Sequence, residues 1–257
     1  MSHWISISLL FAALMSHAES PADKLTAAGV AEFTAAYQAW DGNRFAAAAE
    51  LFRQASTNVP GSSTNFYWLG AAQFHRMLQL RSLPASRTNA LAADAAMDAA
   101  LSALNSAVKL DGQNAESHAL LGTLYGMKID GNLFRAVRFG PKVEKHRSAA
   151  MKSGRDNSRV RYLLGTCQFH MAEKPAAWRE ALASFLAAEK LFLSEKQRPA
   201  GPLEPRWGYT SCLTFIGRTY ELLGQPAEAT EYFRKALALH PADHLAREGL
   251  ARVTEKK

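Results

Sequence analysis

Cysteine is scarce in this sequence: only Cys167 and Cys212 occur in 257 residues. Two thiols are too few to hold together a small domain built on disulfides. Strand signals are scarce as well, because runs of alternating β-branched residues and Asn-Gly turns do not occur. The composition therefore excludes a disulfide scaffold and argues against a β-sheet protein.

Sequence motifs of common catalytic sites are missing too. There is no phosphate-binding loop of the GxxxxGK[ST] type, and GxGxxG, GxSxG and HExxH do not occur. His240 and His244 stand four residues apart, but Pro241 between them marks a helix end. We expect these two to be surface residues rather than metal ligands. The sequence thus predicts no enzyme activity, no catalytic residue, no cofactor and no metal site.

The apolar run near the N-terminus has the character of a signal peptide. Ile5–Met15 is uncharged and too short to span a bilayer, and Ser16 and Ala18 suit cleavage before Glu19. We therefore predict a signal peptide at 1–18 and a mature chain that is periplasmic or secreted. An uncleaved anchor is the alternative, because the residues before Ile5 include no Lys or Arg. The lack of any Asn-x-Ser/Thr acceptor, together with export, favours a bacterial envelope protein.

Helix signals dominate the rest of the chain, in which Ala, Leu, Glu, Lys and Arg fill long segments. The segment 226–241 shows the pattern clearly, with Pro226 at its start and Pro241 just past its end. Its apolar residues recur at spacings of three and four, as expected for an amphipathic helix. They are Ala229, Tyr232, Phe233, Ala236, Leu237 and Leu239.

The segment 210–241 contains two such helices joined by a turn at Gly224-Gln225. Its pattern residues are, in order, Leu213, Ile216, Gly217, Tyr220, Ala229, Phe233 and Ala236. This order and spacing closely resembles the tetratricopeptide repeat, a helix-turn-helix unit of about 34 residues. Small residues at Gly217, Ala229 and Ala236 allow the paired helices to approach closely. The resemblance implies an all-α fold, a right-handed α-α superhelix of helix-turn-helix repeats.

Less regular copies of the repeat precede this one. They span 31–60, 64–112, 115–157 and 158–192, so the sequence predicts about five repeats within a superhelix at 24–254. A polar capping helix is expected at 242–254. Two of the turns are expected to be lengthened, at 81–95 and at 126–142.

One nine-residue string occurs twice, as YWLGAAQFH at 67–75 and as YLLGTCQFH at 162–170. The Tyr, Phe and His of each string share one helical stripe, because they are spaced i, i+7 and i+8. In tetratricopeptide proteins this stripe faces a concave groove in which partners dock, so the resemblance implies a binding site. The same stripe could instead pack neighbouring repeats together, and this alternative stays open. The predicted groove residues are Tyr67, Phe74, His75, Arg159, Tyr162, Phe169, His170 and Arg218.

Positive charge is concentrated in the segment 128–161. It holds ten Lys or Arg and three acids, an excess of 7 that equals the net charge of +7 of the whole chain. The excess predicts an acidic partner or an anionic membrane surface, and a solvated helix face is the alternative. Gly140-Pro141 is expected to leave only a short helix after a loop. The predicted basic surface residues are Arg135, Arg138, Lys142, Lys145 and Arg147.

Together these features predict a non-catalytic scaffold or adaptor of the cell envelope that docks a protein or peptide carrying acidic groups. Binding of anionic lipid or another polyanion through 128–161 is the alternative function. Export argues against a nucleic-acid partner, and the oligomeric state is left open. Cys167 and Cys212 should be buried free thiols, because their separation of about 10 Å along the helix axes exceeds the reach of a disulfide bond. Trp207 is predicted to staple the start of the helix that follows it, and an exposed anchor is the alternative.

Overall fold

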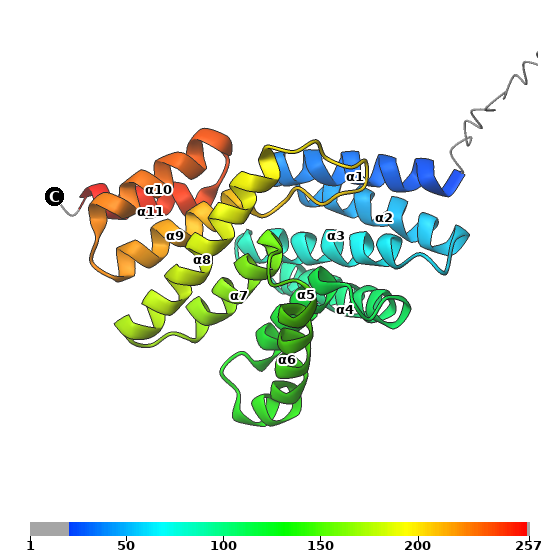
Figure 1. The fold of residues 1–257 in the computed structure, drawn as a ribbon, viewed down its shortest axis with the longest axis horizontal. Helices are drawn as coiled ribbons and strands as arrows, with labels where there is room; N and C mark the ends of the chain where they lie inside the picture. The colour runs from blue at the N-terminus through cyan, green and yellow to red at the C-terminus, as the bar shows by residue number, and fades with distance from the viewer. Residues whose placement is uncertain (1–20, 256–257) are drawn as a thin grey trace, which may run out of the picture.

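The computed structural model describes residues 21–255, which form helices and their connections without a strand (Figure 1). The predicted all-α class is therefore confirmed. The signal peptide predicted at 1–18 lies outside the described residues. The helices of the described part are α1 (Pro21–Ala39), α2 (Gly42–Asn58), α3 (Ser63–Ser82), α4 (Arg87–Leu110), α5 (Ala115–Ile129), α6 (Leu133–Ser153), α7 (Ser158–Met171), α8 (Pro175–Lys196), α9 (Tyr209–Leu222), α10 (Pro226–Leu239) and α11 (His244–Glu255).

The helices pack as five consecutive pairs, and together the pairs form a right-handed α-α superhelix. The pairs are α1 with α2, α3 with α4, α5 with α6, α7 with α8 and α9 with α10, while α11 covers the last pair (Figure 1). Aromatic, aliphatic and alanine side chains form one continuous core from α1 to α9 and a second core between α9, α10 and α11. None of the helices within 21–255 is both long and apolar enough to cross a bilayer.

The close approach of the paired helices depends on glycines in the first helix of a pair. A Cβ atom at Gly165 would lie 2.6 Å from the ring of Phe185, and one at Gly217 would lie 2.8 Å from the ring of Phe233. Both distances are too short for real Cβ contacts, so the second helix would have to move away. At Gly122 the nearest atom would be the backbone nitrogen of Arg147, at 3.6 Å. The α5–α6 pair therefore tolerates a larger residue where the others do not.

Short polar residues begin most of the helices. In each case the side-chain oxygen of the residue before the helix accepts a hydrogen bond from a backbone N–H of the first turn. These N-caps are Asp41, Ser62, Ser86, Asn114, Asn132 and Asn157. Local sequence thus sets where these helices start.

The two turns that were predicted to be lengthened are short in the structure. The extra residues of the second pair extend α3 and α4, and only residues 83–86 connect these helices. The break predicted at Gly140-Pro141 is wrong, because α6 continues through Pro141. Proline removes one backbone hydrogen bond, but Phe139 before it and His146 after it both pack against Tyr125 of α5. Tertiary packing on both sides therefore holds the helix together.

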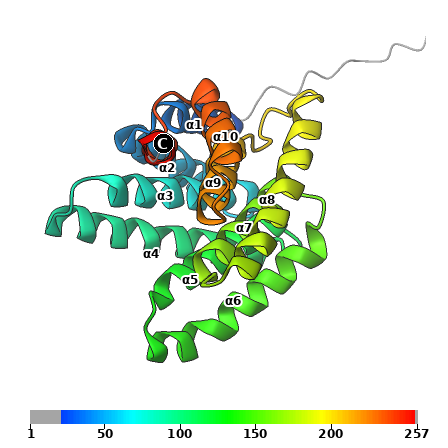
Figure 2. The ribbon, with the colours of Figure 1, turned by 90° about the vertical axis from the view of Figure 1, so that its left-hand side faces the viewer.

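The first repeat also differs from its prediction, since its first helix starts at Pro21 and the predicted boundary at 31 falls inside α1. Residues near the end of α1 contact the last repeats directly (Figure 2). The Tyr37 hydroxyl lies 2.8 Å from Oγ of Ser211 in α9, and the Tyr37 ring stacks on His240, with 6.4 Å between ring centroids. The two ends of the superhelix therefore meet through side-chain contacts of Tyr37.

Candidate functional site

The two copies of the repeated string lie on the first helices of two pairs, α3 and α7. Most of the predicted groove residues are buried there. The buried members are Tyr67, Phe74, His75, Arg159, Tyr162 and Phe169. His170 is exposed and Arg218 is partly exposed. The buried side chains pack inside the protein, and contact with a partner stays a prediction for the set as a whole.

His75 occupies the centre of an aromatic cluster that joins distant parts of the chain. Its ring centroid lies 5.1 Å from that of Phe33, 5.3 Å from that of Tyr37 and 4.9 Å from that of Trp207. Nδ1 of His75 lies 2.8 Å from the carbonyl oxygen of Ala71. Burial lowers the pKa of His75 to about 4, so the imidazole is neutral at neutral pH. His75 is therefore a packing residue in this structure, unlike its counterpart His170.

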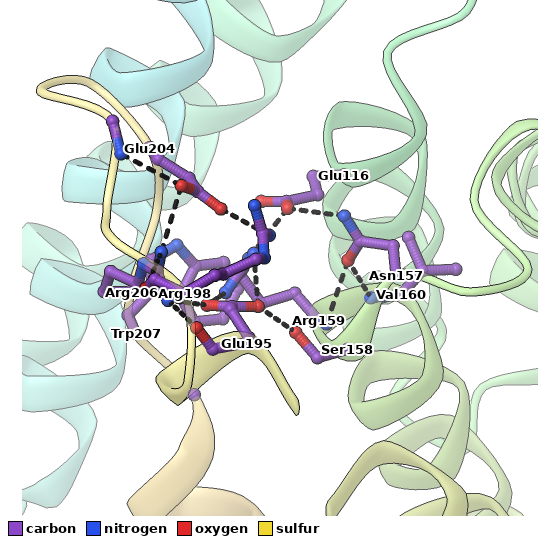
Figure 3. Close-up of polar contacts among 12 residues, drawn as sticks. Glu116, Asn157, Ser158, Arg159, Val160, Glu195, Arg198, Glu204, Arg206 and Trp207 are labelled. Carbon is purple, nitrogen blue, oxygen red and sulfur yellow. Dashed lines mark hydrogen bonds and ion pairs between the residues drawn. The ribbon is translucent and has the colours of Figure 1, made fainter. Parts of the chain in front are cut away.

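Arg159 is held between two carboxylates inside the protein (Figure 3). Its Nε donates to Oε1 of Glu116 at 2.7 Å, and its Nη1 and Nη2 donate to the carboxylate of Glu195 at 2.9 and 3.1 Å. Burial alone would lower the pKa of Arg159, but the Glu116 and Glu195 carboxylates outweigh it and raise that pKa. The guanidinium thus already has two partners of its own chain.

The connection between α8 and α9, residues 197–208, lies against the N-terminal ends of α3, α5 and α7, and we call it the strap (Figure 3). Nε1 of Trp207 donates to the Tyr67 hydroxyl at 3.0 Å, and Nε1 of Trp68 donates to the carbonyl oxygen of Leu203 at 3.2 Å. Trp207 therefore anchors the strap to α3. These contacts of Trp207 lie with α3, and the predicted staple on the start of α9 stays a prediction.

A cavity of about 290 Å³ opens between the strap and these helix ends. Its lining residues are Thr64, Tyr67, Trp68, Asn114, Ala115, Glu116, Asn157, Leu203 and Pro205. Glu116 is the carboxylate in this lining, and it accepts hydrogen bonds from Arg159, Asn157 and the Tyr67 hydroxyl. A carboxylate occupied by three donors is poorly placed to take a proton from a substrate. The cavity thus offers no free acid-base pair.

Arg218 of α9 forms a partly exposed site together with residues of α7. Its Cζ lies 5.0 Å from the ring centroid of Phe169 and 5.2 Å from that of Phe215, both within range of a cation-π interaction. Burial, followed by the charge of Arg252, lowers the pKa of Arg218. Within residues 21–255 no carboxylate forms an ion pair with this guanidinium. The charges of Glu221 and Asp243 partly oppose this lowering, so Arg218 is a partly exposed cation that lies near carboxylates but is in ion-pair contact with none of the described ones.

His170 borders the same site at the end of α7. Its ring centroid lies 5.8 Å from that of Phe215. Partial burial of the ring, followed by the charge of Arg218, lowers the pKa of His170. The string at 162–170 thus contributes an exposed histidine next to a cation on an aromatic surface. The string at 67–75 is buried against α1 and the strap.

All five predicted basic surface residues lie on α6 and are exposed. Arg147 pairs with Glu144 at 2.7 Å. Lys142 Nζ lies 5.0 Å from the ring centroid of Tyr125, and Arg138 Cζ lies 5.2 Å from that of Phe139. The positive charge is thus spread along the outer side of the helical hairpin made by α5 and α6.

Sequence reasoning missed the carboxylates of Glu116 and Glu195 and the histidine pair His118–His146. The Nδ1 atoms of the two histidines lie 2.9 Å apart in a buried contact between α5 and α6. Burial, followed by the charge of His118, lowers the pKa of His146 to about 4. Residues 28 to 43 positions apart meet in these contacts, and no periodic signal in the sequence connects them.

No group of three His, Cys, Asp or Glu side chains in the described part of the chain could hold a metal ion. His240 stacks on Tyr37, and the ring of His244 lies 6.4 Å from that of Trp40. Cys167 and Cys212 are both free thiols, as predicted, although Cys167 is only half-buried. His240 and His244 therefore contribute to the contact between the two ends of the superhelix.

Comparison with known proteins gives the same fold. Residues 211–253 match the tetratricopeptide repeat family. None of the curated proteins compared matches the sequence. The structure is similar to that of TTC0263, a thermophilic tetratricopeptide protein of Thermus thermophilus, with a TM-score of 0.63 and 16% identity over 91% of this chain and 99% of that one. It is also similar to a chain of the APC/C hetero-tetramer Cut9–Hcn1, with a TM-score of 0.63, 17% identity and coverage of 92% of this chain and 37% of that one. The match to the last repeat and the similarity of the whole fold together support a tetratricopeptide-repeat protein.

Proposed function

We propose that the protein is a non-catalytic scaffold that docks a protein partner and receives an acidic group of that partner at Arg218. The fold supports the first half of this proposal, because tetratricopeptide proteins are generally protein-interaction scaffolds. Solenoids of this kind offer extended surfaces made by successive repeats. The proposal therefore needs a surface that is still open in this chain.

Two contacts within the protein cover parts of the first helices of the pairs. Trp207 and the strap cover α3, and Tyr37 reaches across to α9. The face made by α7 and α9 remains accessible at His170 and Arg218. An extended segment of a partner that crosses this face would meet the rings of Phe169 and Phe215 beside the guanidinium.

The single observation that carries the proposal is that Arg218 is partly buried and that no carboxylate of residues 21–255 is in ion-pair contact with it. A guanidinium that has lost part of its hydration gains more from a carboxylate than a fully solvated one does. Arg159 shows the contrast, because its charge is already balanced by Glu116 and Glu195. Hydrogen bonds to charged groups contribute about 1.5–3 kcal/mol, which corresponds to roughly 10- to 100-fold in affinity.

The proposal of a non-catalytic role is supported by how the buried charges are used. Glu116 is held by three donors, and Glu195 is bound by Arg159 and Ser158. Neither carboxylate is free to act as a general base. We accordingly assign the mechanism to docking, with no cofactor.

The test uses pairs of extended peptides that differ only in Glu against Gln. We expect wild-type protein to prefer the Glu peptides, and Arg218→Gln to lose this preference by about tenfold or more. Arg234→Gln is the matched control, because Arg234 is an exposed arginine on α10. Equal binding of Glu and Gln peptides by the wild-type protein would overturn the assignment of Arg218.

Export to the envelope is part of the same proposal. It is supported by the apolar run Ile5–Met15 and the small residues Ser16 and Ala18 before Glu19. The experiment is N-terminal sequencing of the protein recovered from a periplasmic extract. A chain beginning at Glu19 is the expected result, and an intact N-terminus in the membrane fraction would favour the uncleaved anchor.

A further inference from the structure

The hairpin of α5 and α6 carries an unusual apolar surface at its tip. Leu133, Phe134 and Val137, in the first two turns of α6, are 76%, 87% and 74% exposed. Figures 1 and 2 show that this hairpin projects from the rest of the superhelix. Single exposed apolar residues are ordinary, but three large neighbours at this degree of exposure indicate a surface that binds something apolar.

These side chains lie on the face of α6 that points away from its own pair. At about 3.6 residues per turn, Leu133, Phe134 and Val137 fall opposite His146 and Ala150, which are buried in the hairpin. α6 packs mainly on α5 and touches α7 only slightly. The apolar tip thus belongs to no intramolecular core in the described structure.

Exposed cations lie among the apolar tip residues and continue along α6. They are Arg135, Arg138, Lys142 and Lys145. No carboxylate of residues 21–255 is in ion-pair contact with any of these four side chains. Two acids occur nearby: Asp130 lies in the turn before α6, and Glu144 is paired with Arg147. This end of α6 therefore presents apolar side chains together with cations that are in no ion pair within the described residues.

We propose that the tip of α6 binds the surface of an anionic bilayer, with Leu133, Phe134 and Val137 inserted among the lipids and the four cations at the phosphate level. A helix with apolar residues on one side and Lys and Arg beside them binds at the boundary between headgroups and acyl chains, about 5–10 Å deep. In such a bilayer the anionic headgroups pair with the cations and the acyl chains cover the apolar side chains, so one occupant accounts for both features.

The shape of the surface favours a bilayer over a protein partner. A stable protein interface usually buries about 800 Å² on each side and needs a broad matching face. Three side chains on the projecting end of a hairpin form a convex tip, which enters a lipid interface without a preformed pocket. This surface is separate from Arg218, so failure of either proposal leaves the other intact.

The experiment is co-sedimentation of the full chain with vesicles of phosphatidylcholine alone, or of phosphatidylcholine and phosphatidylglycerol in equal parts. Residues 1–18 contain no Lys, Arg, Asp or Glu, so a preference for the anionic vesicles reports on the rest of the chain. We expect tighter binding to the anionic vesicles, weakened by salt. Phe134→Ser/Val137→Ser should weaken binding by about tenfold or more.

Two matched controls isolate the tip. Leu91→Ser removes an exposed leucine from α4 and should leave binding unchanged. Arg135→Gln/Arg138→Gln should clearly reduce the preference for anionic vesicles, whereas Arg179→Gln/Arg234→Gln, at exposed arginines of α8 and α10, should preserve most of it. Equal binding to both vesicle types would overturn the proposal. Salt-sensitive binding that survives Phe134→Ser/Val137→Ser would refute insertion. If this variant instead bound vesicles as the wild type does but lost a protein partner, the tip would be assigned to that partner.

Discussion

The Glu116–Arg159–Glu195 cluster makes a sharp prediction about stability. Arg159 is 3% exposed, and both carboxylates are nearly as well buried. Arg159→Met keeps most of the side-chain volume but removes three charge-assisted hydrogen bonds. It leaves the Glu116 carboxylate in the interior without its cation, while the Glu195 carboxylate keeps only the longer ion pair with Arg206, at 3.7 Å. We expect Arg159→Met to be one of the most damaging single substitutions in this chain.

The magnitude follows from the cost of an unpaired buried charge. Removing one partner of a buried ion pair typically lowers the free energy of unfolding by about 3–5 kcal/mol. Replacing all the charged partners together is often nearly neutral, because no charge is then left unpaired. The triple variant Arg159→Met/Glu116→Gln/Glu195→Gln should therefore recover most of the loss.

The assay is urea unfolding at neutral pH, followed by circular dichroism, on the wild type, Arg159→Met and the triple variant. The linear extrapolation gives the free energy of unfolding, and equal slopes show that the variants expose the same surface. A loss below about 1 kcal/mol for Arg159→Met would refute the reasoning, because it would make the cluster equivalent to a surface ion pair. A triple variant no more stable than Arg159→Met would refute it as well.

Three further predictions concern packing and pH. The pKa of His75, about 4 in the fold and near its ordinary value when unfolded, means that the unfolded chain binds more protons between these values. Lowering the pH from 7 to 5 should thus reduce the free energy of unfolding by about 2 kcal/mol through His75. Urea titrations at both pH values should show that His75→Phe weakens this pH dependence of the free energy of unfolding. Gly165→Ala should cost about 1–3 kcal/mol by overpacking against Phe185, while Gly122→Ala should be close to neutral or slightly stabilising, as thermal unfolding would show. Trp207→Ala should cost about 3–5 kcal/mol and speed proteolytic cleavage within the strap at 197–206; unchanged cleavage would contradict its role as the anchor.

Much of the fold was accessible from sequence because it depends on short-range spacing. The residues of 210–241 recur at helical intervals, and the small residues Gly217, Ala229 and Ala236 stand where the paired helices meet. The helix pairs and the capping helix follow from such signals. Pro141 was misread, since its local preference for a break is overcome by packing of α6 on α5.

The candidate site was only partly predictable. The sequence identified Arg159 and Arg218 as similar cations on equivalent helices. The structure separates them, because Glu116 and Glu195 neutralise Arg159 while Arg218 has aromatic neighbours instead. The twin histidines differ in the same way: His75 is enclosed by Phe33 and Trp207, and the end of α7 leaves His170 exposed.

By itself, the sequence determined the helices, their pairing and the chemical character of the basic segment, all of which arise from residues close together along the chain. Only the tertiary structure decided that the ends of the superhelix meet through Tyr37 and that Trp207 folds back onto Tyr67, 140 residues away. Contacts at such separation depend on the accumulated rotation from one repeat to the next and on the path of the strap. Small changes in either would bring different side chains together. The repeat pattern in the sequence therefore specifies the helix pair, but it does not specify the contact between the two ends of the superhelix.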